Sequence, residues 1–154
     1  MTLEELFAGR PVNMEEIKAR LRKVAQELGL PLGDRQKTYN SRLAQELAKW
    51  AEEKGKGEEF HDAVFRAYFV DGINIAKIEE LASLAKTVGL SVKEAKKVLE
   101  GRTHGKAVDS DWKKSHQLGI TAVPTFVINQ RAVVGAQPYE VLEHFLEENK
   151  IKRK

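Results

Sequence analysis

The segment that is most informative about the fold is residues 119–135, which read G-I-T-A-V-P-T-F-V-I-N-Q-R-A-V-V-G. Pro124 precedes four strand-forming residues, Thr125–Ile128, and residues 132–134 follow as a second short run. Runs of β-branched and aromatic residues on either side of a short loop are typical of a β-hairpin. The sequence therefore predicts two antiparallel strands joined by a turn at residues 129–131.

Outside this stretch the apolar residues recur at helical spacing. Asn13 with Glu16 and Ser91 with Glu94 have the spacing of capping boxes, so each pair marks the start of a helix. A two-stranded hairpin is marginal by itself, so we expect helices to pack against it. Helices are predicted at about residues 3–7, 14–28, 43–50, 60–69, 75–88, 92–101, 106–118 and 138–146.

These patterns give a fold class that is mostly α with a small antiparallel β-hairpin. Residues 13–100 are expected to form an all-helical domain, and residues 106–150 an α-β-β-α part. The ends, residues 1–12 and 151–154, are expected to be poorly ordered. Trp50, Trp112, Tyr68 and the phenylalanines lie on apolar stripes and are expected in the core.

The composition excludes several functional classes. The 154 residues carry a net charge of only +3, with both signs mixed along the helices, so a nucleic-acid partner is not expected. The absence of cysteine excludes disulfides and thiolate catalysis in this chain. No apolar run approaches the roughly 20 residues of a membrane span, and no signal peptide is visible.

The sequence offers poor candidates for a metal, a cofactor or a phosphate. His61, His104, His116 and His144 lack metal-binding spacing, and we expect no metal and no cofactor. The glycine-flanked segment 101–105 does not follow a strand, so a helix end and linker is the better interpretation there.

Several short segments of the sequence, taken together, resemble one protein family. The resemblance is to the DsbA-type thioredoxin-like oxidoreductases, FrnE-like branch, over about residues 13–146. It implies a partial thioredoxin-like α/β fold with an inserted all-helical domain. The segments are N-S-R-L-A at 40–44, F-R-A-Y-F at 65–69, T-V-G-L at 87–90, V-P-T-F at 123–126 and G-A-Q-P at 135–138.

The resemblance also implies a site. Members of the family use a Cys-x-x-Cys motif opposite a cis-proline loop, and this chain has only the loop. Ala122, Val123 and Pro124 would form it, with a cis bond before Pro124 and the Val123 backbone turned toward an extended substrate peptide. The alternative is an edge strand that simply starts at a trans Pro124. A Pro124→Ala variant that bound peptides unchanged would exclude the loop as the binding site.

The function expected from these features is a fragment or a redox-dead form of a protein disulfide oxidoreductase, inactive by itself. One alternative is part of a glutathione-dependent enzyme, as in 2-hydroxychromene-2-carboxylate isomerases and kappa-class glutathione transferases. The other is a non-catalytic helical binding module. The expected partners are peptides or proteins at the loop and a second copy paired along Thr125–Ile128, and the expected compartment is the bacterial cytoplasm.

Overall fold

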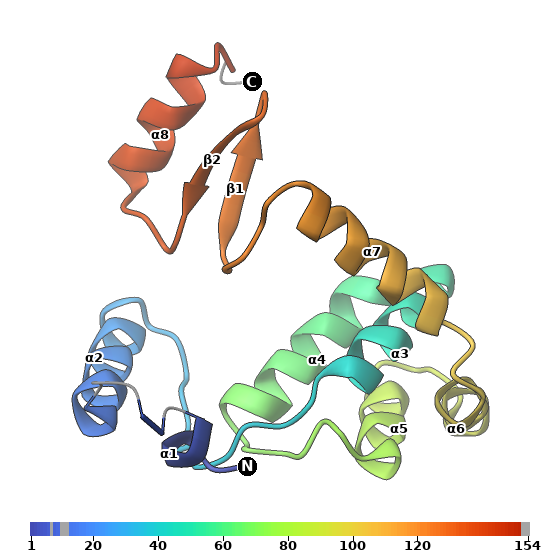
Figure 1. Ribbon diagram of the computed structural model, residues 1–154. Coiled ribbons are helices and arrows are strands. Elements are labelled where there is room, and N and C mark those ends of the chain that lie inside the picture. The colour runs from blue at the N-terminus through green and yellow to red at the C-terminus, as the bar shows by residue number, and fades with distance from the viewer. Residues whose placement is uncertain (7, 10–12, 152–154) are drawn as a thin grey trace. The chain divides into compact units, whose positions relative to one another are not determined.

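The structure is a computed structural model that describes residues 1–6, 8–9 and 13–151. It is helical apart from one two-stranded antiparallel sheet (Figure 1), so the predicted fold class is confirmed. None of the helices in the described ranges has the length and apolarity that a bilayer crossing requires. The elements are α1 (Leu3–Leu6), α2 (Met14–Glu27), α3 (Arg42–Glu53), α4 (Gly57–Phe69), α5 (Ile78–Thr87), α6 (Val92–Gly101), α7 (Gly105–Gln117), β1 (Thr125–Ile128), β2 (Arg131–Val134) and α8 (Tyr139–Glu148).

The chain divides into two compact units, Met1–Val108 and Asp109–Lys154, and α7 contributes residues to both. Parts of the predicted disordered ends, residues 7, 10–12 and 152–154, lie outside the described residues. The described start of the chain pairs with a later segment, because Thr2 and Lys37 form an antiparallel bridge.

The core of the first unit lies among α3, α4, α5 and α6. In α3 the small and apolar residues recur every three or four positions and form one buried face, which includes Leu47 and Trp50. The core prediction for Trp50 is therefore confirmed. The cluster comprises Ala44, Leu47, Ala48, Trp50, Ala51, Phe60, Ile75, Leu81, Ala82, Ala85, Ala95, Val98 and Leu99.

The helix starts depend on local hydrogen bonds. The Asn13 side chain accepts hydrogen bonds from the N–H groups of Glu15 and Glu16, which caps α2 as predicted. The Ser91 side chain accepts one from the N–H of Glu94, which caps α6 as predicted.

The predicted start of the helix at residue 75 is wrong, because α5 begins at Ile78. The Asn74 side chain accepts a hydrogen bond from the Ala76 N–H at 3.0 Å, and its carbonyl accepts one from Lys77 at 3.1 Å. These bonds form a turn that delays the helix. Ile75 is buried nonetheless. Its apolar side chain thus indicates a buried position, but the residue does not belong to the helix.

In the second unit, β1 and β2 pair with Ile128 opposite Arg131. The loop therefore contains only Asn129 and Gln130, both at positive φ, and the predicted three-residue turn is wrong at Arg131. The Arg131 guanidinium contacts the Glu148 carboxylate at 2.8 Å and so ties the hairpin to the end of α8. Trp112 in α7 is 47% exposed, so its predicted place in the core is wrong. The core prediction is also wrong for three phenylalanines, which are exposed: Phe65, Phe69 and Phe126.

Candidate functional site

The segment predicted to contact peptides follows directly after α7. Gly119, at φ 69°, ends that helix: its N–H donates to the carbonyl of His116, and the N–H of Ile120 donates to that of Ser115. This left-handed position favours glycine, because other residues meet a steric penalty there. The chain then leaves the helix axis and reaches β1 within five residues.

Ala122, Val123 and Pro124 form an exposed loop that leads into β1. The Val123–Pro124 peptide bond is cis. The Thr125 hydroxyl donates to the Ala122 carbonyl at 2.6 Å, and the Gly135 N–H donates to the Pro124 carbonyl at 2.8 Å. These two bonds fix the residues on either side of Val123, whose own surface is 89% exposed.

The hairpin register decides which backbone groups of β1 face outward. Because Gly135 donates to Pro124, this pair is hydrogen-bonded, and hydrogen-bonded pairs alternate along an antiparallel ladder. Phe126 and Ile128 therefore bond to β2, whereas the N–H and C=O groups of Thr125 and Val127 point away from it. Within the described residues, no hydrogen bond uses the backbone of Val123, Thr125 or Val127. We call these three residues the open edge.

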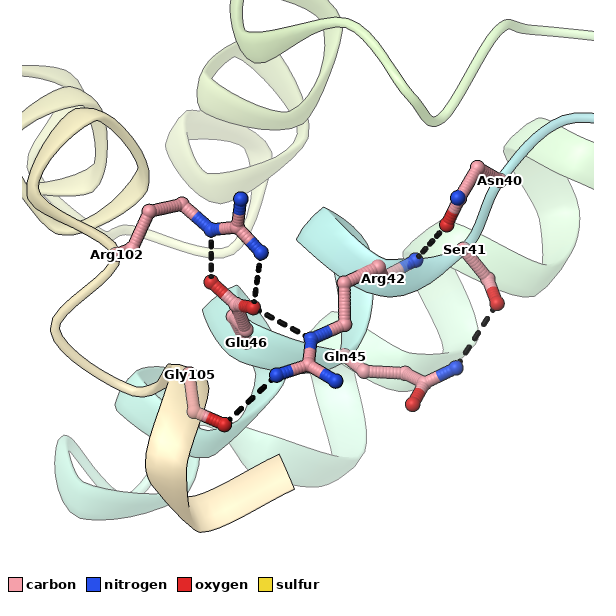
Figure 2. Close-up of polar contacts among 7 residues, drawn as sticks. All are labelled: Asn40, Ser41, Arg42, Gln45, Glu46, Arg102 and Gly105. Atoms are coloured by element: carbon pink, nitrogen blue, oxygen red, sulfur yellow. Dashed lines mark hydrogen bonds and ion pairs between the residues drawn. The ribbon is translucent and has the colours of Figure 1, made fainter. Parts of the chain in front are cut away.

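The first unit contains a buried carboxylate that the sequence analysis did not identify. Glu46 of α3 is fully buried and lies between two guanidinium groups (Figure 2). Arg102 donates to both of its carboxylate oxygens at 2.7 Å, and Arg42 donates to one at 2.6 Å. Arg42 also donates to the Gly105 carbonyl at 2.8 Å. The cluster thereby connects α3 with the loop between α6 and α7.

The hydrogen bonds from Arg102, with those from Arg42, lower the pKa of the Glu46 carboxyl from 4.5 to about 2 against the opposing effect of burial. The carboxylate is therefore ionised and fully paired at neutral pH. An ionised, paired carboxylate of this kind stabilises the fold, whereas a general acid or base needs a pKa near the working pH. We assign Glu46 a structural role.

Only part of this cluster could be recognised from the sequence. Arg42 and Glu46 are four residues apart, a spacing that also describes many exposed helix pairs. Arg102 comes from a segment 56 residues away and adopts a left-handed helix-capping conformation at φ 50°. The interpretation of segment 101–105 as a helix end and linker is thus confirmed, but its contact with Glu46 could not be foreseen.

Comparisons with known proteins cover nearly the whole chain. The sequence model of the DSBA-like thioredoxin domain matches residues 2–147. YwbO of Bacillus subtilis, described as uncharacterized, is 36% identical over 112 residues, which are 72% of this chain and 56% of YwbO. The ClpXP adapter protein SpxH of Halalkalibacterium halodurans is 30% identical over 140 residues, which are 82% of this chain and 46% of SpxH. The chain thus spans about half the length of these relatives.

Solved structures of DsbA-type proteins are also similar to this chain. The probable DsbA oxidoreductase SCO1869 of Streptomyces coelicolor has a TM-score of 0.83 and 30% identity, and the match covers 99% of this chain and 68% of that one. The cytosolic disulfide reductase DsbM of Pseudomonas aeruginosa, solved with GSH, has a TM-score of 0.57 and 26% identity over 90% of this chain and 77% of that one. The predicted thioredoxin-like fold with a helical insertion is confirmed.

Proposed function

The chain belongs to the DSBA-like thioredoxin domain family, and on this premise we propose that it supplies the peptide-contacting part of a DsbA-type protein disulfide oxidoreductase. The observation that carries the proposal is the open edge. The backbone N–H and C=O groups of Val123, Thr125 and Val127, every second residue, make no hydrogen bond within the described residues. An extended peptide that adds to the edge of a sheet pairs with backbone groups of this kind. Ala122, Val123 and Pro124 would be the first residues that the peptide meets.

The chain has no thiolate of its own, because the sequence contains no cysteine. In this proposal it is a fragment or a redox-dead form of an oxidoreductase of the FrnE-like branch. It binds a peptide but exchanges no disulfide, since the attacking species in that exchange is a thiolate.

A titration with a fluorescein-labelled, unstructured decapeptide tests the peptide contact. Val123→Pro removes the backbone N–H of Val123, whereas Val123→Ala keeps it and shortens only the side chain. Loss of one backbone hydrogen bond is expected to weaken binding by about three- to tenfold in the proline variant, with little change in the alanine variant. Equal affinity of both variants and the parent would remove Val123 from the contact.

We also propose that two copies of the chain pair along Thr125–Ile128 in the absence of another strand. An unpaired edge is a template for a second chain, and a two-fold axis would make the two edges partners of each other. Val127→Pro is expected to give a monomer in sedimentation experiments at high micromolar concentration, and Val127→Ala a dimer, because only proline removes the outward N–H. A monomeric parent chain at that concentration would contradict the pairing.

A second candidate function is a non-catalytic binding module. SpxH is described as an adapter protein, and a chain without cysteine suits such a role. The two proposals differ in where a partner binds: an adapter that used the helical unit would be insensitive to Val123→Pro. A glutathione-dependent enzyme stays the other alternative, because the related DsbM was solved with GSH.

We propose the bacterial cytoplasm as the compartment. DsbM, which resembles this chain in sequence and fold, is described as cytosolic. Fractionation of a bacterium that expresses the natural gene is expected to place the protein with cytoplasmic markers, and recovery with periplasmic markers would contradict the assignment.

A further inference from the structure

The first unit contains a hollow of about 430 Å³ between α3 and α4 that the proposed function does not use. Ala44 and Ala48 lie one turn apart on α3 and form part of its floor. Their small side chains leave space opposite Val64 and Phe65 of α4. A volume of this size is typical of small-molecule sites, which range from about 300 to 1,000 Å³.

Aromatic rings form a connected wall of this hollow. Phe65 and Phe69 lie with ring centroids 6.3 Å apart, and Phe69 meets Tyr68 edge-on at 4.9 Å. Tyr68 in turn meets Tyr39 at 6.3 Å. Rings at these separations offer faces and edges on which a further ring can stack, because aromatic pairs favour centroid distances of about 4.5–7 Å.

The rim of the hollow is polar but carries little charge. Of the described residues that line it, none is Asp, Glu, Lys or Arg. The Ser41 hydroxyl accepts a hydrogen bond from Gln45 at 2.9 Å, and a hydroxyl can make further bonds as donor and acceptor. The Thr38 hydroxyl lies 3.1 Å from the Tyr68 hydroxyl at the same rim. Among the described lining residues the one basic side chain is His61, whose Nε2 already lies 3.6 Å from the Glu52 carboxylate. An anionic ligand would therefore lose its hydration and meet a basic group that already faces a carboxylate.

We propose that this hollow binds an uncharged aromatic compound of about two rings that bears a hydroxyl group. The size follows from a comparison of volumes, since an apolar cavity of about 150 Å³ accommodates benzene and this hollow is nearly three times larger. The ring system would stack on Phe65 and Phe69, and its hydroxyl would reach Ser41. All described residues of the hollow belong to the first unit, so ligand binding there does not depend on peptide binding at Val123.

The test uses 2-naphthol as the probe and the full chain as the protein. Amide chemical shifts are followed during the titration, and saturable changes are expected for residues 38–48 and 61–75. Decahydro-2-naphthol has the same carbon skeleton and hydroxyl without aromatic rings, and 2-naphthoate carries a charge. Both are expected to bind at least about fivefold more weakly than 2-naphthol.

Two matched variants complete the test. Phe65→Leu removes a ring from the wall but keeps an apolar side chain, and Phe65 is 56% exposed, so the fold should tolerate it. It is expected to weaken 2-naphthol binding about three- to tenfold, whereas Phe126→Leu in the second unit leaves it unchanged. Absence of saturable shifts up to the solubility limit, equal binding of the comparison compounds, or equal effects of the two variants would each overturn the proposal.

Discussion

At the scale of single residues, Gly33 is restricted by its surroundings and not by its backbone angles. Its N–H donates to the Phe69 carbonyl at 2.9 Å, and a Cβ at this position would collide with the Val70 carbonyl oxygen. The loop therefore approaches the end of α4 more closely than any side chain permits. Only glycine allows this approach.

Gly33→Ala is expected to destabilise the first unit by about 2 kcal/mol, because the backbone must move to relieve the collision. Gly101→Ala is the matched control: a Cβ there meets only the Thr103 methyl group at 3.4 Å, and alanine favours the helix. Urea unfolding followed by circular dichroism measures both. Equal stability of Gly33→Ala and the parent would contradict the close approach.

Glu46 links stability to pH. Its pKa is lowered from 4.5 to about 2 in the folded state, chiefly by the Arg102 hydrogen bonds, so its contribution is complete above pH 4.5 and is lost as the pH falls through 2. The size of that contribution is about 3 kcal/mol. Glu46→Gln is therefore expected to be less stable than the parent at pH 7 by about this amount, and to lose less stability than the parent between pH 5 and pH 2.

Unfolding free energies from urea titrations across this pH range check the expectation. Glu100→Gln is the control, because Glu100 is exposed and its removal should leave both the stability and its pH dependence unchanged. Parallel pH profiles of the Glu46 variant and the parent would show that this carboxylate is not the source of the acid sensitivity.

At the scale of secondary-structure elements, α6 depends on its first turn. The Ser91 hydroxyl accepts the Glu94 N–H, one of the backbone groups that a helix start leaves without a partner. Ser91→Ala is expected to cost about 1 kcal/mol in unfolding free energy. Ser83→Ala, on the exposed side of α5, is the matched change and should be neutral. Identical denaturation midpoints for the two variants would contradict a capping role for Ser91.

Most of the secondary-structure elements could be predicted from the sequence, but some of their details could not. The hairpin was predicted from the residues of β1 and β2, but its turn was one residue too long. The two-residue loop needs positive φ at Asn129 and Gln130, and glutamine is not a residue that signals such a turn. Helical spacing likewise identified the stripe that contains Trp112. Spacing tells which residues share a face but not whether other residues cover that face.

At the scale of the whole molecule, the fold class and the family followed from local patterns and from short segments of the sequence. The pairing of Glu46 with Arg102 did not, because it joins segments 56 residues apart and only packing brings them together. The open edge also could not be identified without the strand register. A shift of one residue would turn the outward backbone groups toward β2 and the bonded groups away from it.

The chain as a whole is expected to show no turnover in an insulin-reduction assay with a thiol donor, because it has no cysteine to form a mixed disulfide. A DsbA-type oxidoreductase that carries a Cys-x-x-Cys motif is the positive control. Turnover above the uncatalysed rate by the purified chain would contradict the proposal that this chain exchanges no disulfide.

Amide hydrogen exchange of β1 with and without an extended peptide is the most direct test of the central claim. It should be measured below the concentration at which the chain pairs with itself. We expect slower exchange at Val123, Thr125 and Val127 when the peptide is present, and unchanged exchange at Phe126 and Ile128, which already bond to β2. A peptide that binds while the exchange at those three amides stays the same would contradict strand addition at this edge.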